Sequence, residues 1–143
     1  MNLKDKLLPA FVALIVVGGA AAFVSELFSR SNASAIVDVK VPKLSETAAQ
    51  GKRAFDANCA TCHGESGSGS DQGPPLVHSI YNPGHHADDA FFLAAKRGVR
   101  QHHWRFGNMP PLPDMRDEDL RTLVQYVREL QRANGITFQP HNM

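Results

Sequence analysis

The stretch Cys59-Ala60-Thr61-Cys62-His63 decides how the rest of the sequence is interpreted. Two cysteines separated by two residues in a helical turn can attach to the two vinyl groups of one haem, and a histidine directly after them falls beneath the iron. The pattern C-x-x-C-H is the attachment signature of c-type haem. The sequence therefore predicts one covalently bound haem c, with its iron, held by Cys59, Cys62 and His63.

Other interpretations of the same five residues are weaker. A thioredoxin-type redox pair requires a strand before Cys59 and a βαβ context, and no such strand pattern is present. A structural zinc site needs four ligands and there is no second C-x-x-C pair, although the seven histidines of the chain keep such a site conceivable. A disulfide across so short a loop would be strained.

Composition limits the remaining possibilities. The chain has 143 residues, of which 43% are hydrophobic and 20% charged, and its 15 Lys and Arg nearly balance its 14 Asp and Glu. This length suits one compact domain, and the hydrophobic fraction is too high for a disordered chain. The near-zero net charge argues against a nucleic-acid-binding protein. Two cysteines cannot form a disulfide-rich scaffold.

The hydrophobic residues are concentrated near the N-terminus. Leu7 to Ser25 contains no charged residue, and as a helix rising about 1.5 Å per residue it would span the roughly 30 Å hydrocarbon core of a bilayer. Lys4 and Lys6 precede it, which favours a cytoplasmic N-terminus and an exported remainder. We therefore predict a membrane-anchored protein whose haem domain lies on the periplasmic side.

A removed signal peptide is the alternative to a membrane anchor. Ala33-Ser34-Ala35 has the small-x-small form of a cleavage site, but the apolar run is longer than the usual signal peptide. Cleavage would leave a soluble periplasmic protein. We assign residues 1–28 to the anchor or signal segment, 29–44 to a linker and 45–143 to the haem domain.

In the linker, alternating apolar and charged residues are compatible with a short extended piece at Ile36 to Val41. In the haem domain, apolar periodicity and capping residues predict three helices. The first helix is expected to run to Asn58 with Ser45 as its cap. The second is expected from Asp88 to Arg97, and the last from Asp117 to Gly135, with Asp88 and Asp117 as the capping residues.

These features together resemble the class I monohaem cytochromes c, over about residues 44–134. The resemblance implies an all-α fold, a small cytochrome c-like helical domain wrapped around one haem, here preceded by a single N-terminal hydrophobic helix. In that family a glycine and an aromatic residue of the first helix pack on an apolar and an aromatic residue of the last. Gly51 and Phe55 would then meet Leu123 and Tyr126.

The resemblance also implies two further residues at the haem. Gly73-Pro74-Pro75-Leu76 is similar to the family's Gly-Pro-x-Leu turn, in which Pro74 would offer its carbonyl to Nδ1–H of His63. Met109, followed by two prolines, is similar to the family's methionine ligand loop and would bind the iron opposite His63. Met115 is the alternative ligand, but it lies beside the expected start of the last helix.

The paired histidines depart from the simplest family pattern. His85-His86 and His102-His103 lie before the middle helix and before Met109 respectively. Such residues either hydrogen-bond the haem and pack beside Trp104, or provide a second metal site or an alternative axial ligand, because imidazole is a common ligand for copper, zinc and iron.

The expected function is one-electron transfer by a haem with His/Met axial ligation. The partners would be redox proteins that donate and accept electrons, with the membrane contacted through the N-terminal helix. With both axial positions filled we expect no enzymatic activity, no small-molecule substrate and no nucleic acid. The alternatives are a haem-based sensor or catalytic haem domain with a labile methionine ligand, and a His-rich metal-binding protein.

Overall fold

The computed structural model describes residues 15–23 and 36–140. The chain divides into two units, Met1–Ser34 and Ala35–Met143. In the first unit residues 15–23 are helical, and the rest of the predicted membrane segment lies outside the described residues, as does Ala33-Ser34-Ala35. Within the described ranges no helix has the length and apolar character needed to cross a bilayer. The anchor, the signal-peptide alternative and the exported location therefore stay predictions.

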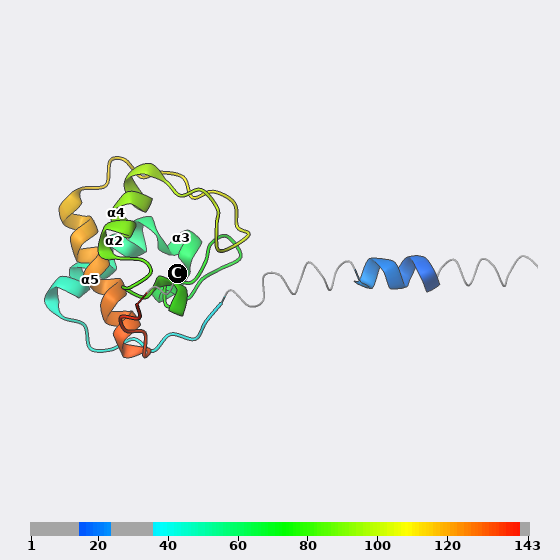
Figure 1. Ribbon diagram of the computed structural model, residues 1–143, viewed down its shortest axis with the longest axis horizontal. Helices are drawn as coiled ribbons and strands as arrows, with labels where there is room; N and C mark the ends of the chain where they lie inside the picture. The colour runs from blue at the N-terminus through cyan, green and yellow to red at the C-terminus, as the bar shows by residue number, and fades with distance from the viewer. Residues whose placement is uncertain (1–14, 24–35, 141–143) are drawn as a thin grey trace, which may run out of the picture. The chain divides into compact units, whose positions relative to one another are not determined.

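The second unit is built from helices joined by long loops (Figure 1). The helices are α2 (Glu46–Asn58), α3 (Ala60–His63), α4 (Asp88–Arg97) and α5 (Asp117–Ala133), with short 3-10 turns η1 (Glu65–Gly67) and η2 (Ser79–Tyr81). No strand occurs among residues 36–140, where Val99 and Met109 form one isolated antiparallel bridge. The domain is all-α, as the sequence predicts.

The start of α2 is capped as expected. The Ser45 hydroxyl oxygen accepts a hydrogen bond from the backbone N–H of Ala48 at 3.2 Å. The same hydroxyl donates to the Glu129 carboxylate of α5 at 2.7 Å, and the Ser45 backbone N–H donates to the other carboxylate oxygen at 3.1 Å. The cap of α2 is thereby joined to α5.

The predicted caps of the other two helices are wrong. Ala87 and Arg116 occupy the cap positions of α4 and α5, neither forms a side-chain capping bond, and Asp88 and Asp117 are the first helical residues. Their carboxylates are engaged elsewhere: Asp88 with Arg128 at 2.8 Å and Asp117 with Lys96 at 2.9 Å. Negative charge in the first turn still stabilises each helix through the helix dipole.

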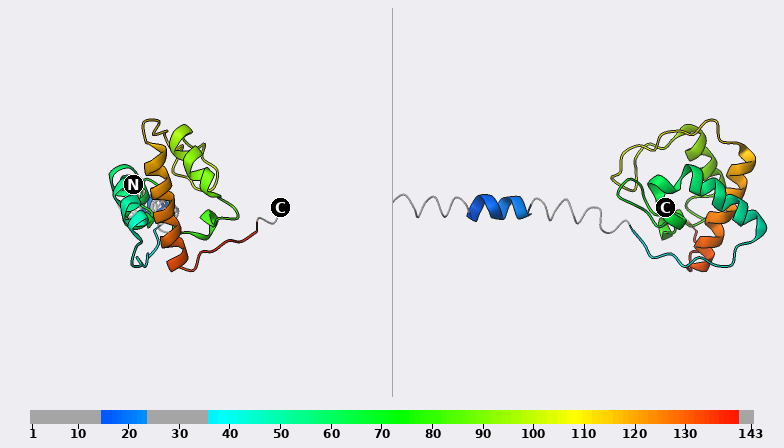
Figure 2. Two further views of the ribbon diagram at one scale, coloured as in Figure 1. Left: turned by 90° about the vertical axis from the view of Figure 1, so that its left-hand side faces the viewer. Right: turned by 180° about the vertical axis from the view of Figure 1, so that it is seen from behind.

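Helix α5 forms the centre of the domain. It contacts both α2 and α4, and it runs between them in the left view of Figure 2. Its apolar stripe is more pronounced than those of α2 and α4, in agreement with its contacts to both helices. The buried apolar residues of this helix are Leu120, Leu123, Val124, Tyr126, Val127 and Leu130.

The contact between α2 and α5 depends on a residue without a side chain. A Cβ atom at Gly51 would lie 1.9 Å from the backbone oxygen of Thr122 and 2.8 Å from the backbone nitrogen of Leu123. One turn further along, the rings of Phe55 and Tyr126 meet edge to face with their centroids 5.5 Å apart, and both are fully buried. The predicted packing of these two helices is confirmed.

Residues 36–44, which the sequence analysis places in a linker, lie against the domain. Val37, Val39 and Leu44 are partly buried against the core. The backbone of Lys40 is bound at both polar atoms by the Asn134 side chain, each at 2.9 Å. No strand forms over segment 36–41. Its backbone makes one hydrogen bond from Val37 N–H to the Ser68 carbonyl at 2.9 Å, and at Lys40 it pairs with the Asn134 side chain.

Substitution Gly51→Ala tests the helix crossing. Alanine gains about 1 kcal/mol of helix propensity over glycine, but overpacking against backbone atoms costs up to about 3 kcal/mol or more. We expect a net loss of about 2 kcal/mol in the free energy of unfolding, measured by denaturant titration of the haem-loaded protein. The neighbouring exposed residue provides the control: Gln50→Ala should stay within about 0.5 kcal/mol of the wild type. Equal effects of both changes would refute the crossing.

Candidate functional site

One cavity gathers most of the predicted haem residues. Its volume is about 480 Å³, and its walls include Cys59 and His63 from the motif, Pro74, and Met109. The remaining walls are largely apolar side chains from α4, α5 and the loop between them. The volume lies within the range of about 300–1,000 Å³ typical of cofactor pockets.

His63 is held in a single orientation by the segment 73–76, through the carbonyl of Pro74. Its Nδ1 lies 2.8 Å from the carbonyl oxygen of Pro74. Because a carbonyl only accepts hydrogen bonds, Nδ1 carries the proton and Nε2 keeps its lone pair. Burial lowers the pKa of His63, and the bond to Pro74 opposes that shift only in part. The imidazole is therefore neutral and able to bind a metal through Nε2.

The segment 73–76 passes so close to the backbone of Cys62 that a glycine is required at position 73. A Cβ atom there would lie 2.7 Å from the carbonyl oxygen of Cys62 and 3.3 Å from its Cβ. The absence of a side chain lets the turn reach the motif, and this brings the Pro74 carbonyl to His63. The resemblance to the family predicts the contact between Pro74 and His63. The close approach of Gly73 to Cys62 explains why a glycine precedes this proline.

The two cysteines are free and differ in exposure. Cys59 is half-buried at the N-cap of α3, and Cys62 is exposed within α3. Burial, with a smaller contribution from Cys62, raises the pKa of the Cys59 thiol to about 11. His63 closes the same turn, so the two thiols and the imidazole belong to one short rigid element.

Met109 and Met115 both line the cavity, but their surroundings differ. Met109 is partly buried in a loop, and its backbone pairs with Val99 through two hydrogen bonds of 3.0 Å. Met115 is 9% exposed and belongs to the hydrophobic core. Its carbonyl accepts a hydrogen bond from Lys96, which ties this segment to the last turn of α4. Met109 is the methionine whose side chain is not already committed to the core.

Trp104 provides a further polar group in the cavity wall. Its indole Nε1 is buried and has no hydrogen-bond partner among the described residues. Leaving a buried donor unpaired costs about 1–3 kcal/mol, so an acceptor on a bound group would satisfy it. Together with two thiols, a neutral imidazole, a thioether and apolar walls, this donor fits a haem.

Arg128 holds the loop on one side of the cavity, and the sequence analysis did not identify it. It is 5% exposed and donates to the Tyr81 carbonyl at 2.9 Å and to the His86 carbonyl. It also pairs with Asp88 at the start of α4. The sequence feature that could have indicated its buried position is its place directly after Val127, on the apolar stripe of the last helix.

The two predicted histidine pairs meet in the fold. Ring centroids of His85 and His103 are 5.1 Å apart, and those of His86 and His103 are 5.2 Å apart. His86, His102 and His103 also border the cavity. Burial lowers the pKa of His86, and the hydrogen bond to the Ile80 carbonyl opposes that shift only in part. Burial, with smaller effects of the neighbouring histidines, lowers the pKa of His103.

Comparison with known proteins agrees with this site. The family model described as cytochrome c matches residues 48–131, which include the motif, the Pro74 turn, the histidine pairs and Met109. No curated protein and no solved structure gives a match.

Substitution Arg128→Met tests whether Arg128 holds the loop that contains Tyr81 and His86. Asp88 is exposed and returns to water when its partner is lost. The cost comes from the His86 carbonyl and the buried Gln131 Oε1, which lose their donor, whereas the Tyr81 carbonyl keeps its hydrogen bond from Gln131 Nε2 at 3.1 Å. We expect a loss of about 2 kcal/mol in the free energy of unfolding and faster proteolysis between residues 78 and 88. The control Arg121→Met removes an exposed arginine of the same helix and should change neither measurement. Unchanged proteolysis of Arg128→Met would contradict this role of Arg128.

Proposed function

Because the chain belongs to the cytochrome c family and so carries a covalently bound c-type haem with its iron, we propose that it transfers single electrons between redox proteins. In this proposal Cys59 and Cys62 attach the haem, and His63 and Met109 are the axial ligands. The observation that carries it is the convergence of Cys59, His63 and Met109 on one apolar cavity. Proteins of this family are typically electron carriers and not enzymes.

Each residue has a physical task in this proposal. The bound haem supplies an iron that gains or loses one electron. His63 presents Nε2 because Pro74 holds its other nitrogen at 2.8 Å. The Met109 thioether is a soft, neutral donor, which favours reduced iron and raises the reduction potential. Apolar walls exclude water, which limits the rearrangement of solvent when the charge changes.

The partner surface is proposed to lie at the mouth of the cavity. Leu93 lines the cavity and is 50% exposed, so an apolar side chain reaches solvent beside the site. Electron-transfer proteins associate through small, transient interfaces, and the net charge of +1 provides no strong electrostatic preference for a partner.

We also propose that the domain works outside the cytoplasm, tethered by residues 1–28. The support comes from the uncharged stretch Leu7 to Ser25 and the lysines that precede it. Cleavage near Ala35 would instead release the domain into the periplasm.

Comparison of Met109→Leu with Met115→Leu tests the sixth ligand. Leucine has a similar volume to methionine and lacks sulfur, so each change removes only the donor at modest cost to packing. We expect Met109→Leu to abolish the thioether-to-ferric absorption band at the red end of the spectrum and to lower the reduction potential. Met115→Leu should retain both properties.

The reverse result would transfer the ligand role to Met115. Retention of the band in both variants would exclude both methionines. Absence of the band from the wild-type protein would favour the alternative function, in which a gas or peroxide binds at an open iron position.

Intact mass under denaturing conditions tests haem attachment. The wild-type protein should exceed the mass of its polypeptide by one haem, and Cys59→Ala/Cys62→Ala should carry none, because each thioether requires its own cysteine. The same spectrum, measured on separated membrane and periplasmic fractions, reports whether the first 35 residues are present. A full-length chain in the periplasmic fraction would contradict the anchor, and a shortened chain would identify a cleaved signal.

A further inference from the structure

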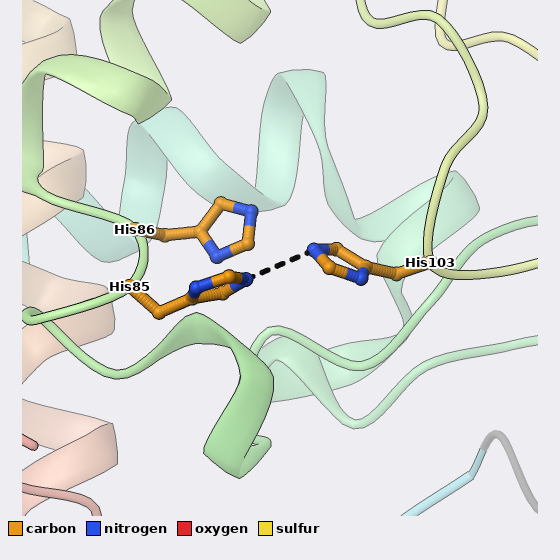
Figure 3. Close-up of side chains that lie close together, drawn as sticks. All are labelled: His85, His86 and His103. Atoms are coloured by element: carbon orange, nitrogen blue, oxygen red, sulfur yellow. Dashed lines mark hydrogen bonds between the residues drawn. The ribbon is translucent and has the colours of Figure 1, made fainter. Parts of the chain in front are cut away.

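Three histidines from two separate loops face one another beside the haem cavity. His85 and His86 come from the turn between η2 and α4, and His103 comes from the loop between α4 and α5. Each offers a ring nitrogen, and these three nitrogens all lie within 4.8 Å of one another. Figure 3 shows the three rings around a common space, with a dashed line for the hydrogen bond between His85 and His103. This bond joins Nε2 of His85 and Nε2 of His103, which are 3.2 Å apart.

We propose that His85, His86 and His103 bind one divalent ion of a late first-row transition metal, of the Zn²⁺ or Cu²⁺ class. Imidazole nitrogen suits both ions, and three imidazoles with a water in the remaining position form a common coordination set. This site is separate from the haem iron, for which the proposed function assigns His63 and Met109 as ligands.

The spacing of the nitrogens agrees with such a centre. In a tetrahedral site with Zn–N bonds of about 2.0–2.1 Å, two ligand nitrogens are about 3.3–3.4 Å apart. The observed separation of 3.2 Å between His85 and His103 is close to that value. The ligand nitrogens of all three residues lie within 4.8 Å of one another, so the nitrogen of His86 is at most about 1.5 Å beyond this spacing.

His86 is already oriented by a neighbouring carbonyl. Its Nδ1 lies 2.8 Å from the carbonyl oxygen of Ile80, so Nδ1 carries the proton and Nε2 is available as a ligand. Metal-binding histidines in proteins usually donate their second nitrogen to a carbonyl or carboxylate in this manner. The backbone of His86 is in turn held by Arg128, whose charge is paired with Asp88.

The site is open to ions from solution. His103 is exposed and His86 is partly buried, so the cluster lies at the surface of the domain with its back against the cavity wall. Without metal, Nε2 of His85 and Nε2 of His103 share a hydrogen bond, so one of these two rings carries its proton on Nε2. Binding of the ion replaces this hydrogen bond, and the proton of that ring moves to Nδ1.

The test uses the full chain with haem attached, oxidised, and purified without a polyhistidine tag. Attached haem is necessary because free thiols of Cys59 and Cys62 bind both ions themselves, and its absorption spectrum confirms that the protein is loaded. Oxidised protein prevents reduction of Cu²⁺. Zn²⁺ binding is measured by titration calorimetry, and Cu²⁺ binding by electron paramagnetic resonance.

The matched variants are His85→Gln/His103→Gln and His78→Asn. His78 lies outside the cluster, and its Nδ1 accepts a hydrogen bond from the Ile80 backbone at 3.2 Å. Asparagine can accept the same bond from the cap position, so this control removes one imidazole and preserves the local structure. The haem spectrum and the unfolding midpoint verify that each variant is folded.

We expect one ion per wild-type chain, with Cu²⁺ displacing Zn²⁺ as the Irving–Williams order predicts, and imidazole nitrogen couplings in the Cu²⁺ spectrum. The double variant should bind at least about tenfold more weakly, since even loss of an outer-shell partner costs about that much. His78→Asn should bind like the wild type. The proposal is overturned if neither ion binds, if the double variant retains wild-type affinity, or if nitrogen couplings are missing.

Discussion

The crossing of α2 over α5 at Gly51 is the constraint on which the rest of the domain depends. No side-chain atom separates the backbone of α2 from Thr122, so the two helices are fixed at closest approach. α2 leads directly into Cys59 and α3, and this places the haem attachment turn. α5 presents Leu120 and Leu123 to the cavity from the other side of the same contact. One glycine thus sets the distance between the attachment motif and the wall opposite it.

The sequence predicts the features that depend on neighbouring residues. The motif, the Ser45 cap and the apolar period of α5 are all local, and the structure contains the cap and the helix. The crossing followed from resemblance to a family and not from periodicity alone. The predicted capping positions at Asp88 and Asp117 are wrong by one residue, because an aspartate suits both the cap and the first turn of a helix. Their partners, Arg128 and Lys96, decide between the two, and they are distant in sequence.

Contacts between distant segments explain what the sequence analysis could not find. Lys40 and Asn134 are 94 positions apart, so their mutual hydrogen bonds leave no pattern in either segment. Arg128 appears in the sequence as a charged residue beside an apolar stripe, and only the fold shows the carbonyls that surround it. The histidine pairs were visible, but their convergence depends on how two loops fold back on one cavity.

The bridge between Val99 and Met109 has a thermodynamic consequence. It closes residues 100–108 into a loop that contains His103 and ends at the proposed iron ligand. Any ligand that orders this loop reduces the conformational entropy that must be lost when Met109 is positioned, and a fixed Met109 favours that ligand in return. Such coupling is reciprocal in free energy. The two proposed equilibria, metal binding at the histidine cluster and iron binding by Met109, are therefore linked through the backbone of residues 104–108, without a shared atom.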